Sequence, residues 1–258
     1  MVSWFQPEQL MHYLFVLVRA VSLLMALPLF GGPGVPPHVK VGLGALTALL
    51  LWPVVQPGPP VADVGGLLVG VAQELFAGLS MGFVVSLAFF ALQVAGHLMD
   101  VPIGFGMVNV LDPQFGGQVP ILGQFYQTLA TLVFFITNGH HAVLRALASS
   151  YEIIPLGGTA WQGGLAQVIV QVVAGTFAMG VRIAVPVIAA TFLTDVALGI
   201  VSRAVPQINV FITGYPIKIA VGFVTLVVAM PVYVGVLAAI FGDGGEMMRW
   251  LWQFLNAH

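Results

Sequence analysis

The amino-acid sequence predicts an all-α integral membrane protein. Only 6% of the 258 residues are charged, whereas 59% are hydrophobic, and the mean hydropathy is +1.04. A water-soluble domain has about a quarter of its residues charged, so most of this surface must face lipid or an apolar partner. The apolar residues form long runs rather than the alternating segments of about ten residues that build membrane β-barrels.

The hydrophobic runs divide into six helical segments, because a helix needs about 20 apolar residues to cross the hydrocarbon core. Clusters of proline and glycine separate the first three segments. The third and fifth segments are too long for one perpendicular crossing, and Pro186 predicts a kink in the fifth. The six segments are Leu10–Phe30, Val39–Val55, Val64–Leu98, Val119–Ala148, Leu165–Val201 and Ile217–Phe241.

A short tail follows the sixth segment and holds Trp250, Trp252 and Phe254 beside Arg249. This composition predicts an amphipathic turn or helix at the membrane interface, with a frayed terminus as the alternative. No soluble-looking block interrupts the hydrophobic segments, so we expect one membrane-embedded domain over residues 1–258.

Several classes of function are excluded by composition. A net charge of −2 offers no basic surface for nucleic acid, whose binding depends on contacts from Lys and Arg to phosphate. The absence of cysteine removes disulfides and thiolate metal sites. Adjacent His140 and His141 point in different directions on a helix, unlike the i, i+4 histidine pair of a zinc site. We therefore predict a protein that is not an enzyme and has no cofactor or bound metal.

Small residues recur every four positions along the third segment, interrupted by one acid. Such spacing lets a second helix approach closely, which is how helices associate in lipid. A lone carboxylate within this stripe should be hydrogen-bonded across an interface or protonated. The alternative is that glycine is simply frequent, with 31 in the chain. The stripe consists of Gly66, Gly70, Glu74, Gly78, Gly82 and Ser86.

The connection Asp100–Gly117 is too apolar for an ordinary solvated loop and too rich in glycine and proline for a continuous helix. Non-helical backbone at membrane depth survives only when it is buried in protein or lines an aqueous cavity. Phe105, Met107 and Phe115 could therefore form a deformable apolar constriction. A loop lying on the extracytoplasmic surface is the alternative.

Two charges lie within the fifth segment. Arg182 and Asp195 are separated by about 20 Å along a helix that rises 1.5 Å per residue, so each needs another partner, on this chain or a different one. Pro206 ends this helix, and a charge and two amides surround the break. We predict a corner that docks neighbouring subunits, with a simple helix terminus as the alternative; its residues are Arg203, Pro206, Gln207, Asn209 and Phe211.

Short motifs follow one another along nearly the whole chain: Arg19 to Pro28, Gln73–Phe83, Ala95–Gly104, Asp112-Pro113, Asn138–His141, Ser149–Gly157 and Ser202–Lys218. Together, and in this order, they resemble the FliR family of type III export-gate proteins. The motifs Asn138–His141 and Pro206–Phe211 are more similar to the flagellar branch of that family than to the injectisome branch.

The resemblance implies a structural and gating subunit of the flagellar type III protein-export channel, in the bacterial inner membrane at the basal body. In that family, FliR assembles with FliP and FliQ, FlhB docks at its cytoplasmic side, and unfolded flagellar substrates pass through. Its helices form broken or kinked hairpins rather than simple spans. A family loop plugs the closed pore, which implies that role for Gly104, Phe105, Gly106, Met107, Asp112, Pro113 and Phe115.

A secondary solute transporter is the alternative function. Helices interrupted by glycine and proline are typical of that class. The two halves of this chain, however, show no convincing internal repeat. Solute uptake by the purified protein in liposomes would favour a transporter, and co-purification with FliP and FliQ would favour the export gate.

Overall fold

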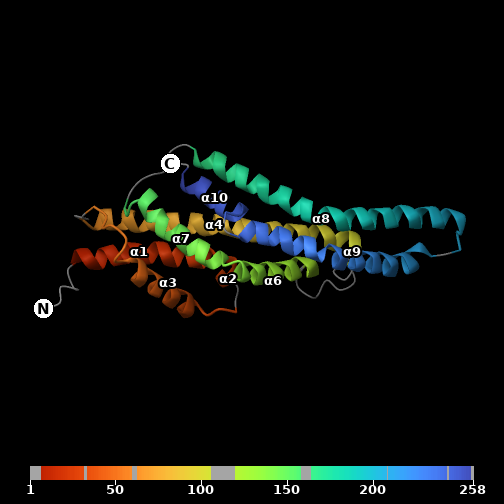
Figure 1. Ribbon diagram of the computed structural model, residues 1–258, viewed down its shortest axis with the longest axis horizontal. Helices are drawn as coiled ribbons and strands as arrows, with labels where there is room; N and C mark the ends of the chain where they lie inside the picture. Colours follow the sequence, from red (N-terminus) through yellow and green to blue (C-terminus); the bar gives the residue numbers. More distant parts are fainter. Residues whose placement is uncertain are drawn as a thin grey trace. The chain divides into compact units, whose positions relative to one another are not determined.

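The computed structural model describes residues 7–31, 34–59, 63–105, 120–157, 164–207, 209–242 and 244–256. All regular secondary structure within these ranges is helical (Figure 1). Four stretches are long and apolar enough to cross a membrane, namely Glu8–Ala26, Val64–Ile103, Leu165–Ala204 and Ile212–Leu255. Two shorter apolar helices, Pro37–Leu51 and Ile121–Ile136, accompany them. The predicted class, an all-α membrane protein, is confirmed.

The helices have the following bounds: α1 (Pro7–Ala26), α2 (Pro28–Gly31), α3 (Pro37–Leu51), α4 (Val64–Ile103), α6 (Ile121–Ile136), α7 (Gly139–Ile153), α8 (Leu165–Ala204), α9 (Val210–Phe241) and α10 (Glu246–Leu255).

The fourth predicted segment is two helices rather than one. Asn138 adopts the left-handed conformation, with φ 58° and ψ 27°, between α6 and α7. Asparagine tolerates this conformation as a single residue but cannot continue a right-handed helix through it. In contrast, α8 remains helical through Pro186, although the proline lacks the amide that would bond the carbonyl four residues earlier.

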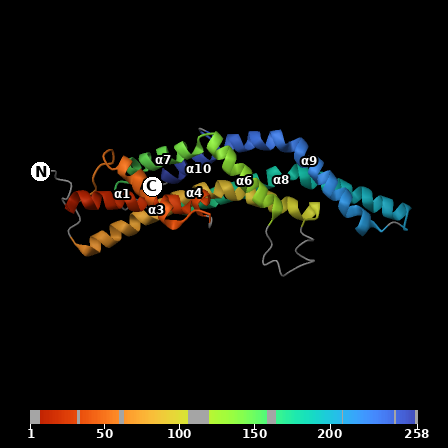
Figure 2. The same cartoon turned by 90° about the horizontal axis from the view of Figure 1, so that it is seen from below.

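The C-terminal tail forms α10, so the alternative of a frayed terminus is wrong. Its apolar face buries Met247, Leu251 and Phe254, while the ion pair between Arg249 and Glu246 stays exposed. The helix lies against α7 (Figure 2). The apolar face of α10 is therefore buried against protein and does not depend on a membrane interface alone.

The chain divides into two compact units, each built from segments that are distant in the sequence. The first unit comprises Met1–Ala88, Asn138–Val172 and Phe241–His258. The second comprises Phe89–Thr137 and Val173–Ile240. The long helices α4 and α8 therefore contribute to both units.

In the first unit, α1 packs between α3 and the first part of α4 (Figure 1). Trp52, just after α3, donates from Nε1 to Nδ1 of His12 at 3.1 Å. Gly44 of α3 lies directly against Val21. These contacts run in opposite directions along α1 and α3, so the two helices form an antiparallel hairpin.

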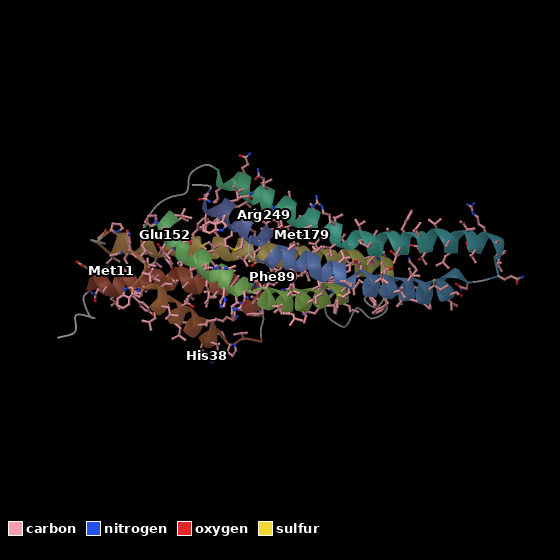
Figure 3. All side chains as sticks on the ribbon, viewed as in Figure 1. Met11, His38, Phe89, Glu152, Met179 and Arg249 are labelled. Atoms are coloured by element: carbon pink, nitrogen blue, oxygen red, sulfur yellow. The ribbon has the colours of Figure 1, made fainter. Side chains whose placement is uncertain are left out.

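In the second unit, α8 and α9 form a hairpin that packs on the last part of α4. Gly180 of α8 faces the carbonyl oxygen of Ala91, and Gly222 of α9 faces Ile103. The outward side chains of α8 and α9 are mostly hydrocarbon (Figure 3). Large apolar residues such as Val228 are exposed there, at 74%.

Candidate functional site

A buried ion pair joins α1 and α4 in the first unit. Arg19 of α1 donates from Nε to Oε2 of Glu74 at 2.6 Å, and from a terminal nitrogen to Oε1 at 3.1 Å. Each side chain is 1% exposed. The two parallel bonds match the fork of a guanidinium to a carboxylate, which is the strongest arrangement of this pair.

The remaining donors of Arg19 bind α7 and the residue that follows it. One terminal nitrogen bonds the carbonyl oxygen and the hydroxyl of Ser150, at 3.1 and 3.2 Å. The other also bonds the carbonyl oxygen of Ile154 at 3.0 Å. The guanidinium carbon lies 4.4 Å from the centroid of the Tyr151 ring. A guanidinium has five N–H donors, and these bonds use all of them.

Glu74 accepts a third hydrogen bond, from the amide of Gly157 at 3.0 Å. Gly157 has a φ of +66°, a conformation that glycine adopts without steric cost. The left-handed turn brings this amide back to α4. Arg19, Glu74, Ser150, Tyr151, Ile154 and Gly157 are called the Arg19 cluster below.

The Arg19 cluster has a structural role and is not suited to proton transfer. Every donor of Arg19 is satisfied, and burial raises the pKa of the Tyr151 phenol well above its usual value, so this phenol stays neutral. Nothing in the cluster is left free to transfer a proton. The arrangement holds α1, α4 and α7 at fixed positions along one another.

The glycine stripe of α4 lies against α1 of the same chain. A Cβ added to Gly78 would collide with Oγ of Ser22 and the carbonyl oxygen of Arg19. Gly70 faces the ring of Phe15, and Gly82 faces Ala26 and the carbonyl of Leu23. Close backbone approach along this stripe brings Arg19 to Glu74.

In the second unit, Asp100 joins the end of α4 to the start of α6, the two helices that the predicted pore loop connects. Its Oδ1 accepts the amide of Leu122 at 3.1 Å, and the amide of Gly123 interacts with the same carboxylate. These are the second and third residues of α6, whose N-cap is Pro120 and makes no side-chain bond. Asp100 thus supplies from α4 the cap that α6 lacks.

The two helices touch by backbone at this point. A Cβ on Gly96 would overlap the backbone of Gly123. Beside this contact is a hollow of ≈ 500 Å³. Its lining is mainly apolar with three polar side chains, and consists of Phe90, Gln93, Val94, His97, Leu98, Pro120, Gly123 and Gln124.

We predict that Asp100→Ala loosens the first turn of α6. Loss of a cap costs about 1 kcal/mol, so amide hydrogen exchange at Leu122 and Gly123 should become roughly fivefold faster, because exchange reports local opening. Asp100→Asn is the matched control, since its amide oxygen can still accept. Equal exchange rates in the alanine variant and the unsubstituted protein would contradict the cap.

Of the predicted plug residues, the structure describes Gly104 and Phe105. Gly104 has a φ of +107° and lies beside the ring of Tyr215. The ring of Phe105 meets that of Phe223 edge-to-face, with centroids 5.8 Å apart. Gly104 and Phe105, which directly follow α4, therefore contact α9. The other predicted plug residues, Gly106, Met107, Asp112, Pro113 and Phe115, lie outside the described residues.

The predicted docking corner is the connection between α8 and α9. Oδ1 of Asn209 accepts the amide of Ile212 at 3.4 Å, so Asn209 caps α9. Arg203, Pro206 and Gln207 are exposed, and Phe211 lies in the first turn of α9. Arg203 makes no bond to the α8 carbonyls within the described part of the chain.

The two charges within the predicted fifth segment have different surroundings in the structure. Asp195 forms an ion pair with Lys218 of α9, with a distance of 2.7 Å between Nζ and Oδ1. This contact joins the two helices near the corner. Arg182 is exposed and has no ion pair or hydrogen bond among the described residues.

Sequence reasoning missed the Arg19 cluster. It singled out Glu74 for its place in the stripe but assigned no partner to Arg19. The signal was present, because two opposite charges that each interrupt an apolar helix satisfy one another most simply by pairing. The cap formed by Asp100 has no comparable signal, since it depends on where α6 begins.

Comparison with known proteins extends over nearly the whole chain. Residues 10–244 match bacterial export proteins, family 1. The flagellar biosynthetic protein FliR of Bacillus subtilis (strain 168) is 34% identical over 240 residues, which cover 92% of this chain and 93% of that protein. FliR of Escherichia coli (strain K12) is 26% identical over 90% of this chain and 88% of its own length.

The Yop proteins translocation protein T of Yersinia pestis is also similar, at 29% identity over 88% of this chain and 89% of its own length. Both units lie largely within the matched range of residues 10–244, so the similarity extends beyond one motif or one helix pair. The chain therefore belongs to family 1 of the bacterial export proteins, the family that includes the flagellar FliR proteins.

Proposed function

We propose that this chain is the structural and gating subunit of the flagellar type III protein-export channel, in the inner membrane at the basal body. The observation that carries the proposal is the similarity to flagellar export proteins over residues 10–244. A component of a type III export apparatus needs rigid helices and apolar contact surfaces rather than a reactive centre. The Arg19 cluster and the exposed hairpin α8–α9 agree with that requirement.

We further propose FliP and FliQ as direct neighbours and FlhB as the partner at the cytoplasmic side. Because α1 of this chain covers Gly70, Gly78 and Gly82, the stripe serves packing within the chain. The surfaces proposed for other subunits are the outward face of α8 and the corner around Arg203 and Asn209. Unfolded flagellar proteins are the proposed substrates.

Co-purification tests the assembly. The tagged chain, expressed with its flagellar export operon, should recover FliP and FliQ in one complex from detergent-solubilised membranes. The same purified chain, placed alone in liposomes, should show no substrate-dependent solute uptake. Recovery of the chain alone, together with uptake of a solute, would reject the export gate in favour of a transporter.

We also propose that the loop beginning at Gly104 closes the pore, because apolar constrictions exclude water and ions only while their ring is complete. Shortening the stretch Gly104–Gly116 should make cells that express the assembled gate leak ions. A second variant replaces the same stretch with glycine and serine at equal length, and it should leak as well, because it removes the apolar side chains but not the chain length. Unchanged ion permeability in correctly assembled deletion complexes would reject the plug.

A further inference from the structure

Arg182 occupies an unusual position on α8. It is the one charge between Gln171 and Asp195, in a stretch that the structure describes throughout. At 1.5 Å per residue, Gln171 and Asp195 lie about 16 and 20 Å away along the helix axis. An arginine side chain cannot span either distance to reach a polar boundary. A charge so placed needs a partner at its own depth.

That partner is not found among the described residues. Gly180 packs α8 onto α4, against the carbonyl oxygen of Ala91 and the side chain of Val94. Two residues further, a helix has turned by about 200°, so Arg182 points away from α4. Its neighbours on the outward face are Ala178, Val185 and Ala189, and all are exposed.

The other helix of the hairpin provides a comparison. From Ile219 to Phe241, α9 carries no charged residue, and Val224, Val228 and Val232 are exposed at 64, 74 and 66%. Lipid tails could cover that surface without cost. They could not cover the outward face of α8, because burying an unpaired guanidinium in hydrocarbon is unfavourable.

We infer that the outward face of α8 around Arg182 is a protein-docking surface whose occupant is a membrane helix of another export subunit carrying an aspartate or glutamate at the depth of Arg182. The inference rests on the proposed function, since it needs an assembled apparatus. The small side chains of Ala178 and Ala189 allow that helix to approach closely. The guanidinium then fixes its axial register through a paired carboxylate, as the fork of Arg19 does with Glu74 within the chain.

Site-specific photo-crosslinking tests the surface in cells that express the whole export apparatus. A photoreactive residue at Ala178 or Val185 should crosslink to a second polypeptide of the apparatus. The same residue at Val228 of α9 is the matched control and should give little or no crosslinked protein. Absence of α8 crosslinks in complexes that still contain FliP and FliQ would overturn the inference and leave the proposed function intact. A crosslink between two copies of this chain would also overturn it.

The charge is tested separately. Arg182→Met should lower the recovery of assembled complex by about tenfold or more, because it leaves a buried carboxylate of the partner unpaired, whereas Arg182→Lys should retain part of it. Arg182→Glu should fail and be rescued by lysine in place of an acid on the crosslinked helix. Wild-type assembly of Arg182→Met would overturn the inference.

The alternative to docking is that the outward face of α8 borders water. The chain has no cysteine, so Ala189→Cys provides a single thiol on the same face. In the assembled complex it should resist a charged, membrane-impermeant maleimide, whereas Arg249→Cys, at a position that is 61% exposed on α10, is the accessible control. Equal labelling of both positions would mean that this face borders water, and would overturn the docking surface.

Discussion

Replacing Arg19 with methionine should lower the free energy of unfolding by about 3–5 kcal/mol, because removing one partner of a buried pair leaves an uncompensated charge. The carboxylate of Glu74 would keep only the amide of Gly157. The carbonyl oxygens of Ser150 and Ile154 would each lose the bond that Arg19 donates. Thermal unfolding of the purified chain in detergent, followed by circular dichroism, measures the loss.

The chain contains its own control for this experiment. Arg249 pairs with Glu246 at 2.7 Å, but the two side chains are 61 and 39% exposed. Exposed pairs are worth about 1 kcal/mol or less, so Arg249→Met should change the unfolding temperature little. If Arg19→Met and Arg249→Met unfold alike, the Arg19 cluster does not hold the first unit together.

Gly78→Ala should also be strongly destabilising, although it adds one methyl group. That methyl would overlap Ser22 Oγ and the carbonyl oxygen of Arg19, and would lie 3.0 Å from the amide nitrogen of Leu23. Two of these atoms are backbone, so α1 itself must move. Overpacking of this kind costs about 1–3 kcal/mol, and here it also pulls Arg19 from Glu74. Membrane insertion should remain normal, since the chain becomes no less hydrophobic.

Gly199→Ala is the matched substitution. Gly199 is also inside a long helix, and an added Cβ there meets nothing within 4 Å. Alanine is favoured over glycine in a helix by up to about 1 kcal/mol, so this variant should be neutral or more stable. The two unfolding temperatures should therefore move in opposite directions, and a parallel shift would contradict close packing at Gly78.

The class of fold could be predicted because it depends on hydropathy averaged over long segments rather than on single contacts. Hydrophobic length alone specifies helices of membrane-crossing size, and the four-residue period of glycine on α4 predicts close packing without naming the neighbour. Asn138 shows the limit. Hydropathy extends the fourth segment, Val119–Ala148, across this residue, because a single left-handed residue leaves no trace in hydropathy.

The candidate site was harder to predict for a different physical reason. The Arg19 cluster brings together residues of α1, α4 and α7, and Arg19 and Ser150 are 131 positions apart. Sequence shows that such a charge needs a partner but not which one, since pairing depends on how the helices pack. Asp100 is similar, because its role follows from the start of α6 rather than from its own neighbours.

The wide spacing of the Arg19 cluster also bears on how the protein is made. Ribosomes deliver α1 to the membrane well before Glu74 exists, and Ser150 follows 131 positions after Arg19. During synthesis the first helix therefore carries an unpaired guanidinium until Glu74 has been made. Until then the insertion machinery, or water within the incomplete helix bundle, must solvate this charge. The first unit also includes Phe241–His258, so its assembly cannot be complete until α9 and α10 have been made. A nascent chain stalled before α7 should remain protease-sensitive, because Arg19 then lacks its bonds to Ser150 and Ile154.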